Sequence, residues 1–230
     1  MYFQHSQEMW RDFPELVPGV LAVEGINRGV SVLPQVARFN AIAEARLAGT
    51  SEGQLPEIQA WRRTFSKMGL KPTQYRCASE SLLRRFRKEH ALPQIHPLID
   101  LCNAISLAFA IPVAVFDVTK IDGFLEVRYA NGDEAYLTFF GEKETPEEHE
   151  VIFADNEKRV HARRWTNRQS GFSAVQDSTS SVLIVAEAMH DTAAADIERL
   201  VTTLAEELTR MWNVTPKTAM LSESSPRFTF

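Results

Sequence analysis

The amino-acid sequence predicts a single α+β domain, and three features carry this prediction. Amphipathic helical stripes fill much of the first 90 residues, and another follows near the C-terminus. Residues 113–187 contain short β-rich runs separated by turn residues. No repeat, low-complexity block or linker divides the 230 residues, and a hydrophobic content of 44% allows one full core. We therefore expect mixed β-sheets with flanking helices and an N-terminal helical extension, in one domain over residues 1–230.

The first 90 residues predict one strand and three helices. A short strand is expected at Leu16–Glu24, after which apolar residues at helical spacing indicate helices at Leu33–Ala48 and Leu55–Met68. A third helix is expected to begin after the candidate N-cap Ser79 and to run to about His90. These elements form the N-terminal part of the predicted domain.

The rest of the chain is organised around the stretch Leu92–Arg128. Between Pro97 and Pro112, apolar residues lie on almost all sides, which predicts a buried helix that the second proline ends. Val113–Ile121 and Phe124–Tyr129 then read as two strands with turn residues between them. We therefore predict a β-hairpin directly after a core helix.

The second half predicts further strands and one long helix. Alternating polarity favours three strands, at residues 134–140, 151–154 and 159–165. Ser181–Glu187 is almost continuously apolar, which is typical of a central strand buried on both faces. Residues 191–212 predict a helix that packs on the sheet, and residues 214–230 are expected to form a tail. The core of the domain is thus expected over about residues 91–213.

Composition and motifs exclude several classes of protein. Cys77 and Cys102 are the two cysteines and are expected to be reduced thiols, as in the cytoplasm. No apolar run approaches the roughly 20 residues that cross a bilayer, and the N-terminus has no signal-peptide pattern. The chain lacks a glycine-rich phosphate loop, clustered metal ligands, and the H-E-x-x-H and G-x-S-x-G motifs. We expect a cytoplasmic protein without metal, cofactor or membrane partner.

Charge is distributed unevenly along the chain. The formal net charge of −5 argues against a general nucleic-acid binder, and no DNA partner is expected. Basic residues nonetheless concentrate in Ile58–His90 and in Lys158–Arg168, whereas acidic residues concentrate in Asp122–Glu157. A basic face could therefore meet an RNA backbone without overall repulsion.

The most unusual segment is Arg163–Ser170, with three arginines, one tryptophan and two carboxamides in eight residues. Arginine side chains clamp phosphates or carboxylates, and a tryptophan can stack on a base. Six residues are therefore candidates for substrate binding: Arg163, Arg164, Trp165, Arg168, Gln169 and Ser170. The alternative is a strand edge whose arginines form salt bridges with the acidic segment Glu142–Glu150.

Two other polar groups each have two interpretations. Asp100 and Asn103 lie one turn apart on the predicted buried helix, where a structural hydrogen-bonding role competes with a functional one. The segment Met68–Arg76 contains a tyrosine that could stack and basic residues that could bind phosphate, or it is only a turn between helices. The six histidines are scattered, and His190 is the one placed directly after the central strand.

The organising stretch resembles a known family. Its pattern P-x-x-x-F-D-x-x-K-x-x-G-x-x-x-V-R, after a helix with an aspartate and an asparagine, is similar to the editing (B3/B4) domain of the phenylalanyl-tRNA synthetase beta subunit. The resemblance covers roughly residues 93–190 and rests on Asp100, Asn103, Pro112, Phe116, Asp117, Lys120, Gly123, Val127 and Arg128. With MGLKPTQYR upstream and RRWTNRQS downstream, the chain resembles still more the free-standing B3/B4-domain proteins.

The resemblance implies a reaction and a substrate. A free-standing module of this kind is expected to hydrolyse a wrong aminoacyl ester at the 3′ end of a tRNA, which would be its partner. Where the synthetase pattern has a histidine and a strand-end glutamate, this chain has Ala114 and Val185, and Glu187 is the nearest acid on the same strand face. Glu187 and Asn103 are therefore the candidate catalytic residues. The candidates for tRNA contacts are Lys71, Tyr75, Arg76, Arg84 and Arg85.

Two other functions stay open beside trans-editing. One is a non-catalytic tRNA-binding module, and the other is a protein that binds a free amino acid or another small ligand. In the synthetase the region matching Arg163–Ser170 is glycine-rich, so the arginines here imply a pocket reshaped toward an anionic group. Because an aminoacyl ester is already activated, the absence of a nucleophilic triad does not count against hydrolysis.

Overall fold

The computed structural model describes all 230 residues, with six α-helices and twelve strands. The helices are α1 (Gln7–Asp12), α2 (Leu33–Leu47), α3 (Pro56–Lys67), α4 (Ala78–Glu89), α5 (Pro97–Phe109) and α6 (Ala193–Trp212). The strands are β1 (Tyr2–His5), β2 (Val17–Glu24), β3 (Val113–Asp117), β4 (Phe124–Tyr129), β5 (Ala135–Leu137), β6 (Lys143–Glu144), β7 (Val151–Asp155), β8 (Arg159–Arg163), β9 (Arg168–Gln169), β10 (Ser181–Ala188), β11 (Lys217–Met220) and β12 (Arg227–Thr229).

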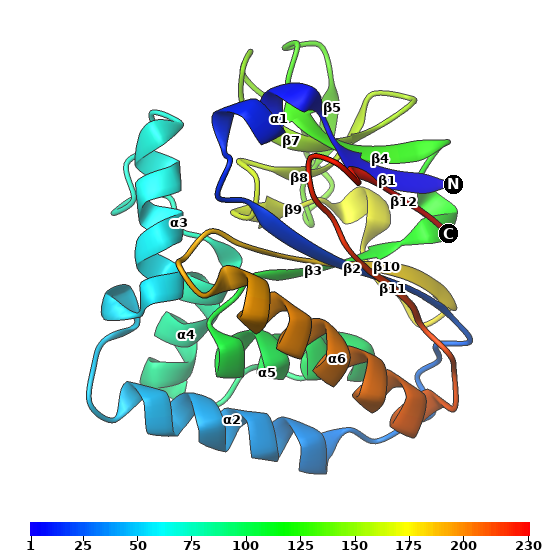
Figure 1. Ribbon diagram of the computed structural model, residues 1–230. Coiled ribbons are helices and arrows are strands. Elements are labelled where there is room, and N and C mark those ends of the chain that lie inside the picture. The colour runs from blue at the N-terminus through cyan, green and yellow to red at the C-terminus, as the bar shows by residue number, and fades with distance from the viewer.

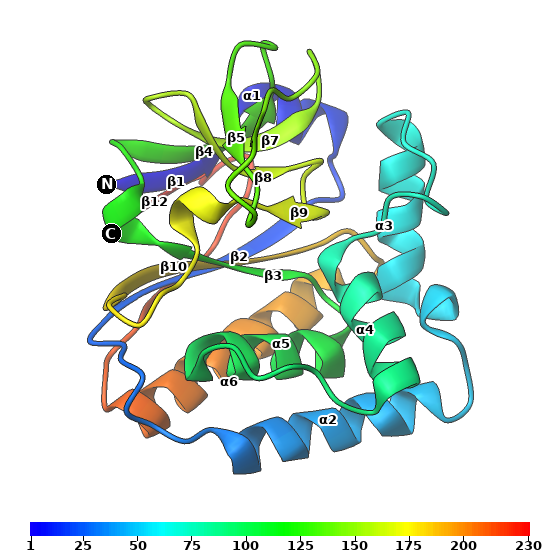
Figure 2. The ribbon, with the colours of Figure 1, turned by 180° about the vertical axis from the view of Figure 1, so that it is seen from behind.

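These elements stack in layers (Figure 1). Helices α2, α5 and α6 lie on one side of a four-stranded sheet, and the larger sheet lies on its other side. Helices α3 and α4 stand together at one end of the stack, as Figure 2 shows from behind. The predicted fold class, α+β with mixed sheets and flanking helices, is confirmed.

Helix boundaries follow the sequence signals closely. Helices α2, α3 and α5 each have a proline in their first turn, where the missing N–H needs no partner. Helices α4, α5 and α6 end at His90, Ala110 and Asn213, each in the left-handed conformation that closes a helix. The predicted helices in these five places are confirmed, although Cys77 rather than Ser79 is the N-cap of α4.

The four-stranded sheet has the order β11-β2-β10-β3 and is antiparallel throughout. Strand β10 lies between two partners, as predicted for a continuously apolar run. Leu183 and Val185 point into the core between the two sheets, whereas Val182 and Ile184 join the core beneath the helices. The period of two along β10 therefore serves two hydrophobic cores at once.

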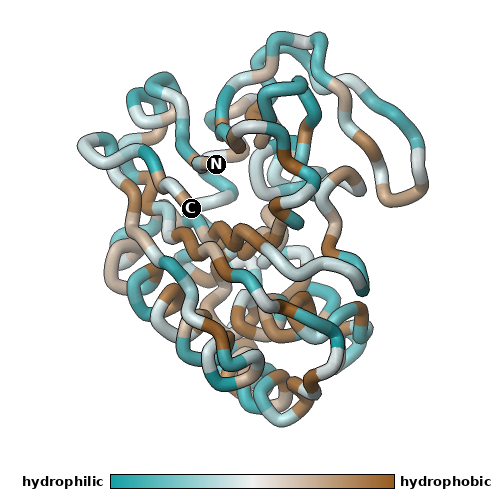
Figure 3. Tube along the Cα trace, turned by 90° about the vertical axis from the view of Figure 1, so that its right-hand side faces the viewer, coloured by the Kyte–Doolittle hydropathy of each residue, from teal (hydrophilic) through white to brown (hydrophobic).

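The larger sheet has eight strands, in the order β12-β1-β4-β7-β8-β5-β6, with β9 paired to β8. The pairs β1–β4 and β5–β8 are parallel and the others antiparallel, so this sheet is mixed. In Figure 3, apolar segments gather in the strands and helices of the interior, and hydrophilic segments dominate the loops. None of the helices is both long and apolar enough to cross a membrane.

Two sequence expectations about the strands are wrong. Val113–Tyr129 is not a hairpin: β3 pairs with β10 in the small sheet, and β4 joins β1 and β7 in the large one. Asp117 caps a 3₁₀ turn at Val118–Lys120 by accepting from the Thr119 N–H at 2.9 Å, and this turn sends the chain to the other sheet.

The expected tail at residues 214–230 instead contains strands β11 and β12. Strand β11 pairs with β2, and β12 pairs with β1, the strand formed by Tyr2–His5. Both strands are short edge strands, which are held mainly by backbone hydrogen bonds and bury few side chains. They therefore show little of the apolar alternation by which a strand is predicted. Strand β1, with 4 residues, and helix α1, with 6 residues, were also not predicted, because elements so short leave too weak a pattern in the sequence.

Candidate functional site: a pocket between the two sheets

A small pocket opens where the two sheets meet the start of α4. Its cavity volume is about 60 Å³. The small sheet contributes Val113, Ala114, Val185 and Glu187, and the large sheet contributes Phe153, Ala162, Arg168 and Gln169. The turn between β8 and β9 and the residues Pro112 and Ala78 complete the lining. We call this site the inter-sheet pocket.

Glu187 is the only acid in the pocket, and it is almost fully buried, with 2% of its surface exposed. Its Oε1 accepts a hydrogen bond from Trp165 Nε1 at 2.9 Å and lies 2.7 Å from His5 Nε2. All the hydrogen bonds of this carboxylate fall on Oε1. Oε2 is therefore the oxygen left for a ligand or a water in the pocket.

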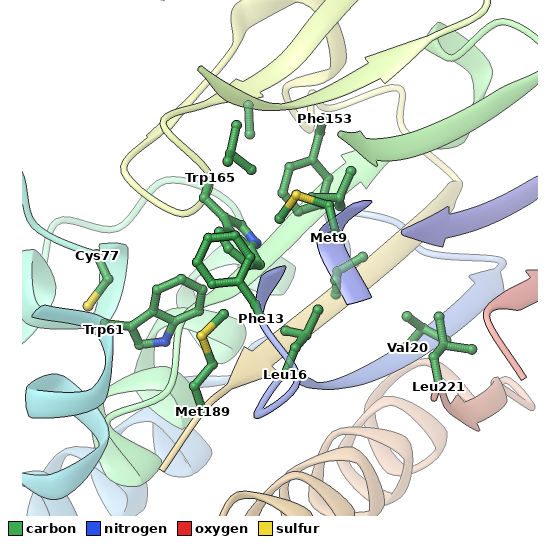
Figure 4. Close-up of a cluster of buried hydrophobic side chains, with 14 of the residues drawn as sticks. Met9, Phe13, Leu16, Val20, Trp61, Cys77, Phe153, Trp165, Met189 and Leu221 are labelled. Atoms are coloured by element: carbon green, nitrogen blue, oxygen red, sulfur yellow. The ribbon is translucent and has the colours of Figure 1, made fainter. Parts of the chain in front are cut away.

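Trp165 is held in the inter-sheet core rather than offered for stacking on a base. Its side chain is fully buried, with ring centroids 4.9 Å from Phe13 and 5.2 Å from Trp61. Figure 4 shows the indole of Trp165 next to the Phe13 ring, with Trp61 and Phe153 nearby. Arg164 and Trp165 both have positive φ, at 48° and 57°, a conformation that costs a non-glycine residue about 1–2 kcal/mol. The strained turn directs the indole inward, toward Glu187.

Carboxamide groups line the mouth of the pocket. Gln169 Nε2 donates to the Val115 carbonyl at 2.5 Å, and Asn167 Nδ2 donates to the Arg76 carbonyl at 2.7 Å. Each carboxamide nitrogen carries two N–H groups, so a second donor is left on each. The turn is further tied to α4, because the Ala78 N–H donates to the Thr166 carbonyl at 2.8 Å. Thr166 Oγ1 is buried in this region without a hydrogen-bond partner.

Ala114 and Val185 are register partners on β3 and β10 at the floor of the pocket. These are the positions where the resemblance places a histidine and a glutamate. Here both carry apolar side chains. Glu187 is two residues beyond Val185 on the same strand face, so its carboxylate enters the pocket one pleat repeat further along β10.

The arginines of Arg163–Ser170 occupy different surroundings. Arg163 is 4% exposed and forms ion pairs with Glu144 and, at 2.7 Å, with Glu150. Hydrogen bonding to Glu150 raises the pKa of Arg163 above its ordinary value. This is the arrangement that the salt-bridge alternative describes.

Arg164 and Arg168 lie nearer the surface. The Arg164 guanidinium sits 4.8 Å above the Tyr75 ring, and Arg168 is exposed and lies 3.3 Å from Glu144. Ser170 is fully buried; its hydroxyl donates to the Leu137 carbonyl and accepts from the Phe172 N–H. Of the six candidates, Trp165, Arg168 and Gln169 line the pocket.

Asn103 does not lie with Glu187. It is half-buried on α5 and lines a different groove, between α2 and the segment 91–94, together with Asp100. Asp100 Oδ1 accepts from the Ile95 N–H at 2.8 Å. The two predicted catalytic residues are therefore on opposite faces of the small sheet.

The candidate tRNA contacts lie on α4 and on the loop before it. Lys71 is exposed without an ion-pair partner, and Tyr75 is half-buried under Arg164. Arg76 lies 3.5 Å from Glu80. Arg84 and Arg85 point out from α4, with Arg85 paired to Glu89 at 2.9 Å. The loop is tied to the pocket lining at its end, because the Arg76 carbonyl accepts from Asn167 and the Ala78 N–H donates to Thr166. Arg84 and Arg85 do not line the pocket, and Arg84 lies 3.9 Å from Glu52.

His5 is the site residue that sequence reasoning missed. It lies 182 residues from Glu187 along the chain and has no motif around it. The available signal was the alternation of Tyr2–His5, in which Phe3 and His5 are buried and their neighbours are not. A histidine on the buried face of a strand requires a polar partner.

The fold and the site together define an α+β domain with one small inter-sheet pocket, a buried carboxylate at its end and cationic side chains beside it. The B3/4 domain family model matches residues 60–217, which is more than half of the chain. The chain therefore belongs to the B3/4 domain family.

Similar proteins are much longer than this chain. The phenylalanine–tRNA ligase beta subunit of Neisseria gonorrhoeae is 28% identical over 174 residues, which are 72% of this chain and 21% of that subunit. The same subunit of Colwellia psychrerythraea is 42% identical over 67 residues, 29% of this chain and 8% of that one. An N-terminal fragment of the Pyrococcus horikoshii phenylalanyl-tRNA synthetase beta subunit aligns over 95% of this chain and 53% of its own, with a TM-score of 0.48 and 10% identity. The chain thus spans about a fifth or less of the curated relatives quoted.

Proposed function

We propose that the protein is a trans-editing hydrolase that removes a wrong amino acid from the 3′ end of a tRNA in the cytoplasm. The observation that carries this proposal is the buried Glu187 carboxylate, which has one oxygen held by two donors and the other left for the pocket. Its family relatives are phenylalanine–tRNA ligase beta subunits, whose substrates include a tRNA by name. The pocket, the family and the exposed cations support the same substrate class.

The proposed reaction needs little from the protein because the ester is already activated. Water adds to the ester carbonyl carbon, the bond to the ribose oxygen breaks, and the products are a free amino acid and a tRNA hydroxyl that takes up a proton from the water. Glu187 either binds the α-ammonium group of the amino acid or orients the water. The second N–H groups of the Asn167 and Gln169 carboxamides, which line the pocket, are our candidates for stabilising the oxyanion that forms on the carbonyl oxygen.

The test is deacylation of a panel of mischarged tRNAs whose amino acids range in size from alanine to phenylalanine. We expect turnover of at least one member and a loss of about 10- to 1,000-fold in Glu187→Gln. Glu207→Gln is the matched control, because Glu207 is equally buried, is paired to Arg38 and lies on α6 outside the pocket. Full activity of Glu187→Gln would remove the carboxylate from the mechanism.

The exposed cations favour one alternative, a tRNA-binding module without catalysis. Lys71 has no ion-pair partner and lies on the loop beside the pocket. If it contacts a phosphate of a single-stranded end, Lys71→Ala should reduce the slope of log affinity against log salt by roughly 0.7. Lys217→Ala, on the opposite edge strand β11, should leave the slope unchanged. Salt-dependent tRNA binding with no turnover of any panel member would support the binding module. Salt-independent binding would exclude both the tRNA hydrolase and the tRNA-binding module.

A further inference from the structure

The Glu187 carboxylate has a second partner from the far end of the chain. His5 reaches it from β1, with Nε2 at 2.7 Å from Oε1 and no exposed surface on the imidazole. Strand β1 lies outside residues 60–217, the part that the B3/4 domain family model matches. The surroundings of Glu187 are therefore completed by a segment of this chain that the family match does not include.

The surroundings of His5 leave Glu187 as its one charged contact. Phe3 and Trp10 pack edge-on against the imidazole, each with a centroid distance of 5.2 Å. His5 also borders an outer groove, whose charged lining residues are Glu8 and Arg11 of α1, Glu126 of β4, Glu223, and Arg227 of β12. None of these five forms an ion pair with His5. His5 Nδ1 is buried and has no hydrogen-bond partner, so the ring is anchored through Nε2 alone.

The geometry fixes how the carboxylate can turn. Trp165 Nε1 and His5 Nε2 approach the same oxygen from the large sheet, through the β8–β9 turn and β1. Two donors on Oε1 hold the carboxylate at one end, so Oε2 takes a defined place toward the pocket. With one donor lost, the carboxylate can rotate about its terminal torsion, which has a broad preference.

We propose that His5 positions the Glu187 carboxylate. Strand β1 would then support the geometry of the inter-sheet pocket without lining it. This inference rests on the proposed function for its effect on turnover, but the contact itself can be measured without any substrate. His5 is a positioning residue, because it acts through Glu187 and does not line the pocket.

The indole N–H resonance of Trp165 reports on the contact directly, because that group donates to the same oxygen. The His5→Leu variant has an apolar side chain of similar volume that cannot donate a hydrogen bond. In its NMR spectrum we expect the Trp165 indole resonance to shift. In His5→Gln, whose amide can donate to Oε1, it should stay near its wild-type position. The Trp212 indole, which donates to the Asn27 carbonyl at 2.8 Å, is the internal control and should not move.

Where His5→Leu fails to fold, His5→Gln decides the question, because its amide can replace the donor to Oε1. A Trp165 resonance near its wild-type position supports the inference, and a clearly displaced resonance overturns it.

Turnover provides the second readout. On a substrate that the panel identifies, His5→Leu should lose about 10- to 100-fold in kcat with little change in KM, the loss typical when a hydrogen-bond partner that orients a metal-binding side chain is removed and the one we expect for this carboxylate. His5→Gln should recover most of it. His190→Gln is the matched control, because His190 is also buried, lies 2.9 Å from a carboxylate, Asp196, and has an unpartnered Nδ1, yet it is outside the pocket.

The outcomes distinguish this inference from the proposed function. A Trp165 resonance that does not shift in folded His5→Leu overturns the positioning role, whatever the activity. A shifted resonance with unchanged turnover also overturns it, because the contact would then be structural only. If the wild-type protein turns over no member of the panel, the proposed hydrolase falls, and the Trp165 resonance still decides whether His5 holds the carboxylate.

Discussion

Arg163 and Arg168 lie five residues apart on neighbouring strands and have different energetic roles. The side chain of Arg163 is 5% exposed between two carboxylates, whereas that of Arg168 is 41% exposed beside one. Both guanidiniums lie near the same ring, that of Tyr136, at 5.5 and 5.4 Å from its centroid. Burial therefore decides which of the two supports the fold and which is available to a ligand.

The first prediction concerns this pair. Arg163→Ala should destabilise the protein by about 3–5 kcal/mol, because it removes the bidentate guanidinium partner of the Glu150 carboxylate, whose side chain is 7% exposed. Arg168→Ala should cost about 0–1 kcal/mol, as for an exposed ion pair. Denaturant unfolding measures both. Equal and small effects would contradict the structural role of Arg163, and a loss of activity in stable Arg168→Ala would support its role at the pocket mouth.

The second prediction concerns the two thiols. Burial raises the pKa of Cys77 to about 11 and that of Cys102 to about 12, so both are protonated at neutral pH. A thiol-specific alkylating reagent should not modify the folded protein at pH 7–8, and should modify both residues after denaturation. Cys77→Ala should retain deacylation activity. Rapid alkylation of Cys77 in the native protein would show that the start of α4 opens.

Single residues of the site were predictable only where the local pattern marks them. Glu187 stands out in the sequence because it follows six apolar or hydroxyl residues of a central strand. Trp165 stands out for its polar neighbours, which suggested an exposed ring, although two consecutive left-handed residues turn it inward. No local pattern gives that backbone conformation to arginine and tryptophan. His5 has no sequence signal that links it to Glu187, since the link exists only after both sheets have formed.

At the scale of elements, α6 lies directly on β2, and Gly19 makes this close approach possible. A Cβ atom at Gly19 would lie 2.5 Å from side-chain carbons of both Ile197 and Val201. Ordinary packing does not allow so short a contact, so helix or strand would have to shift.

The third prediction follows from that contact. Gly19→Ala should destabilise the protein by about 1–3 kcal/mol through overpacking between β2 and α6. Gly49→Ala is the control, because a Cβ there would meet nothing within 4 Å. Thermal unfolding of the two variants measures the difference. A neutral Gly19→Ala would mean that α6 moves away from the sheet at little cost.

Elements with a strong period were predictable, and the pairing of strands was not. Helices α2 to α6 and strand β10 follow from spacing and from proline positions. The prediction of a hairpin was wrong because β3 and β4, although adjacent in sequence, are separated by the turn that Asp117 caps and join different sheets. Strands β11 and β12 were not predicted because their partners, β2 and β1, lie about 200 residues earlier in the chain. Strand pairing over such a distance depends on how the rest of the core has folded.

At the scale of the whole molecule, acid sensitivity should depend in part on Asp155. This buried carboxylate closes the turn after β7. Burial alone would raise the pKa of Asp155, but the His161 ring, with Nε2 3.2 Å away, and hydrogen bonds from the backbone N–H groups of Arg159 and Asp122 outweigh it and lower the pKa to about 2. The folded state thus favours the ionised form.

The fourth prediction gives the sign of this effect. Because the folded pKa lies below the ordinary value of 3.8, the stabilisation is complete above about pH 4 and is lost as the pH falls toward about 2. It amounts to about 2 kcal/mol. Asp155→Asn should be less stable than wild type at neutral pH by about that amount, with the gap closing at low pH. Asp177→Asn, in an exposed ion pair, should show no such closing.

The contact between His5 and Glu187 also has a consequence for how the protein is made. A ribosome releases the N-terminal strand first, and Glu187 emerges only after 182 further residues. Helices α2 to α5 can form from local contacts while the chain is still growing. The pocket cannot, because its carboxylate and the imidazole that holds it meet only when the two sheets close on each other. His5 must therefore remain without its carboxylate partner through most of synthesis.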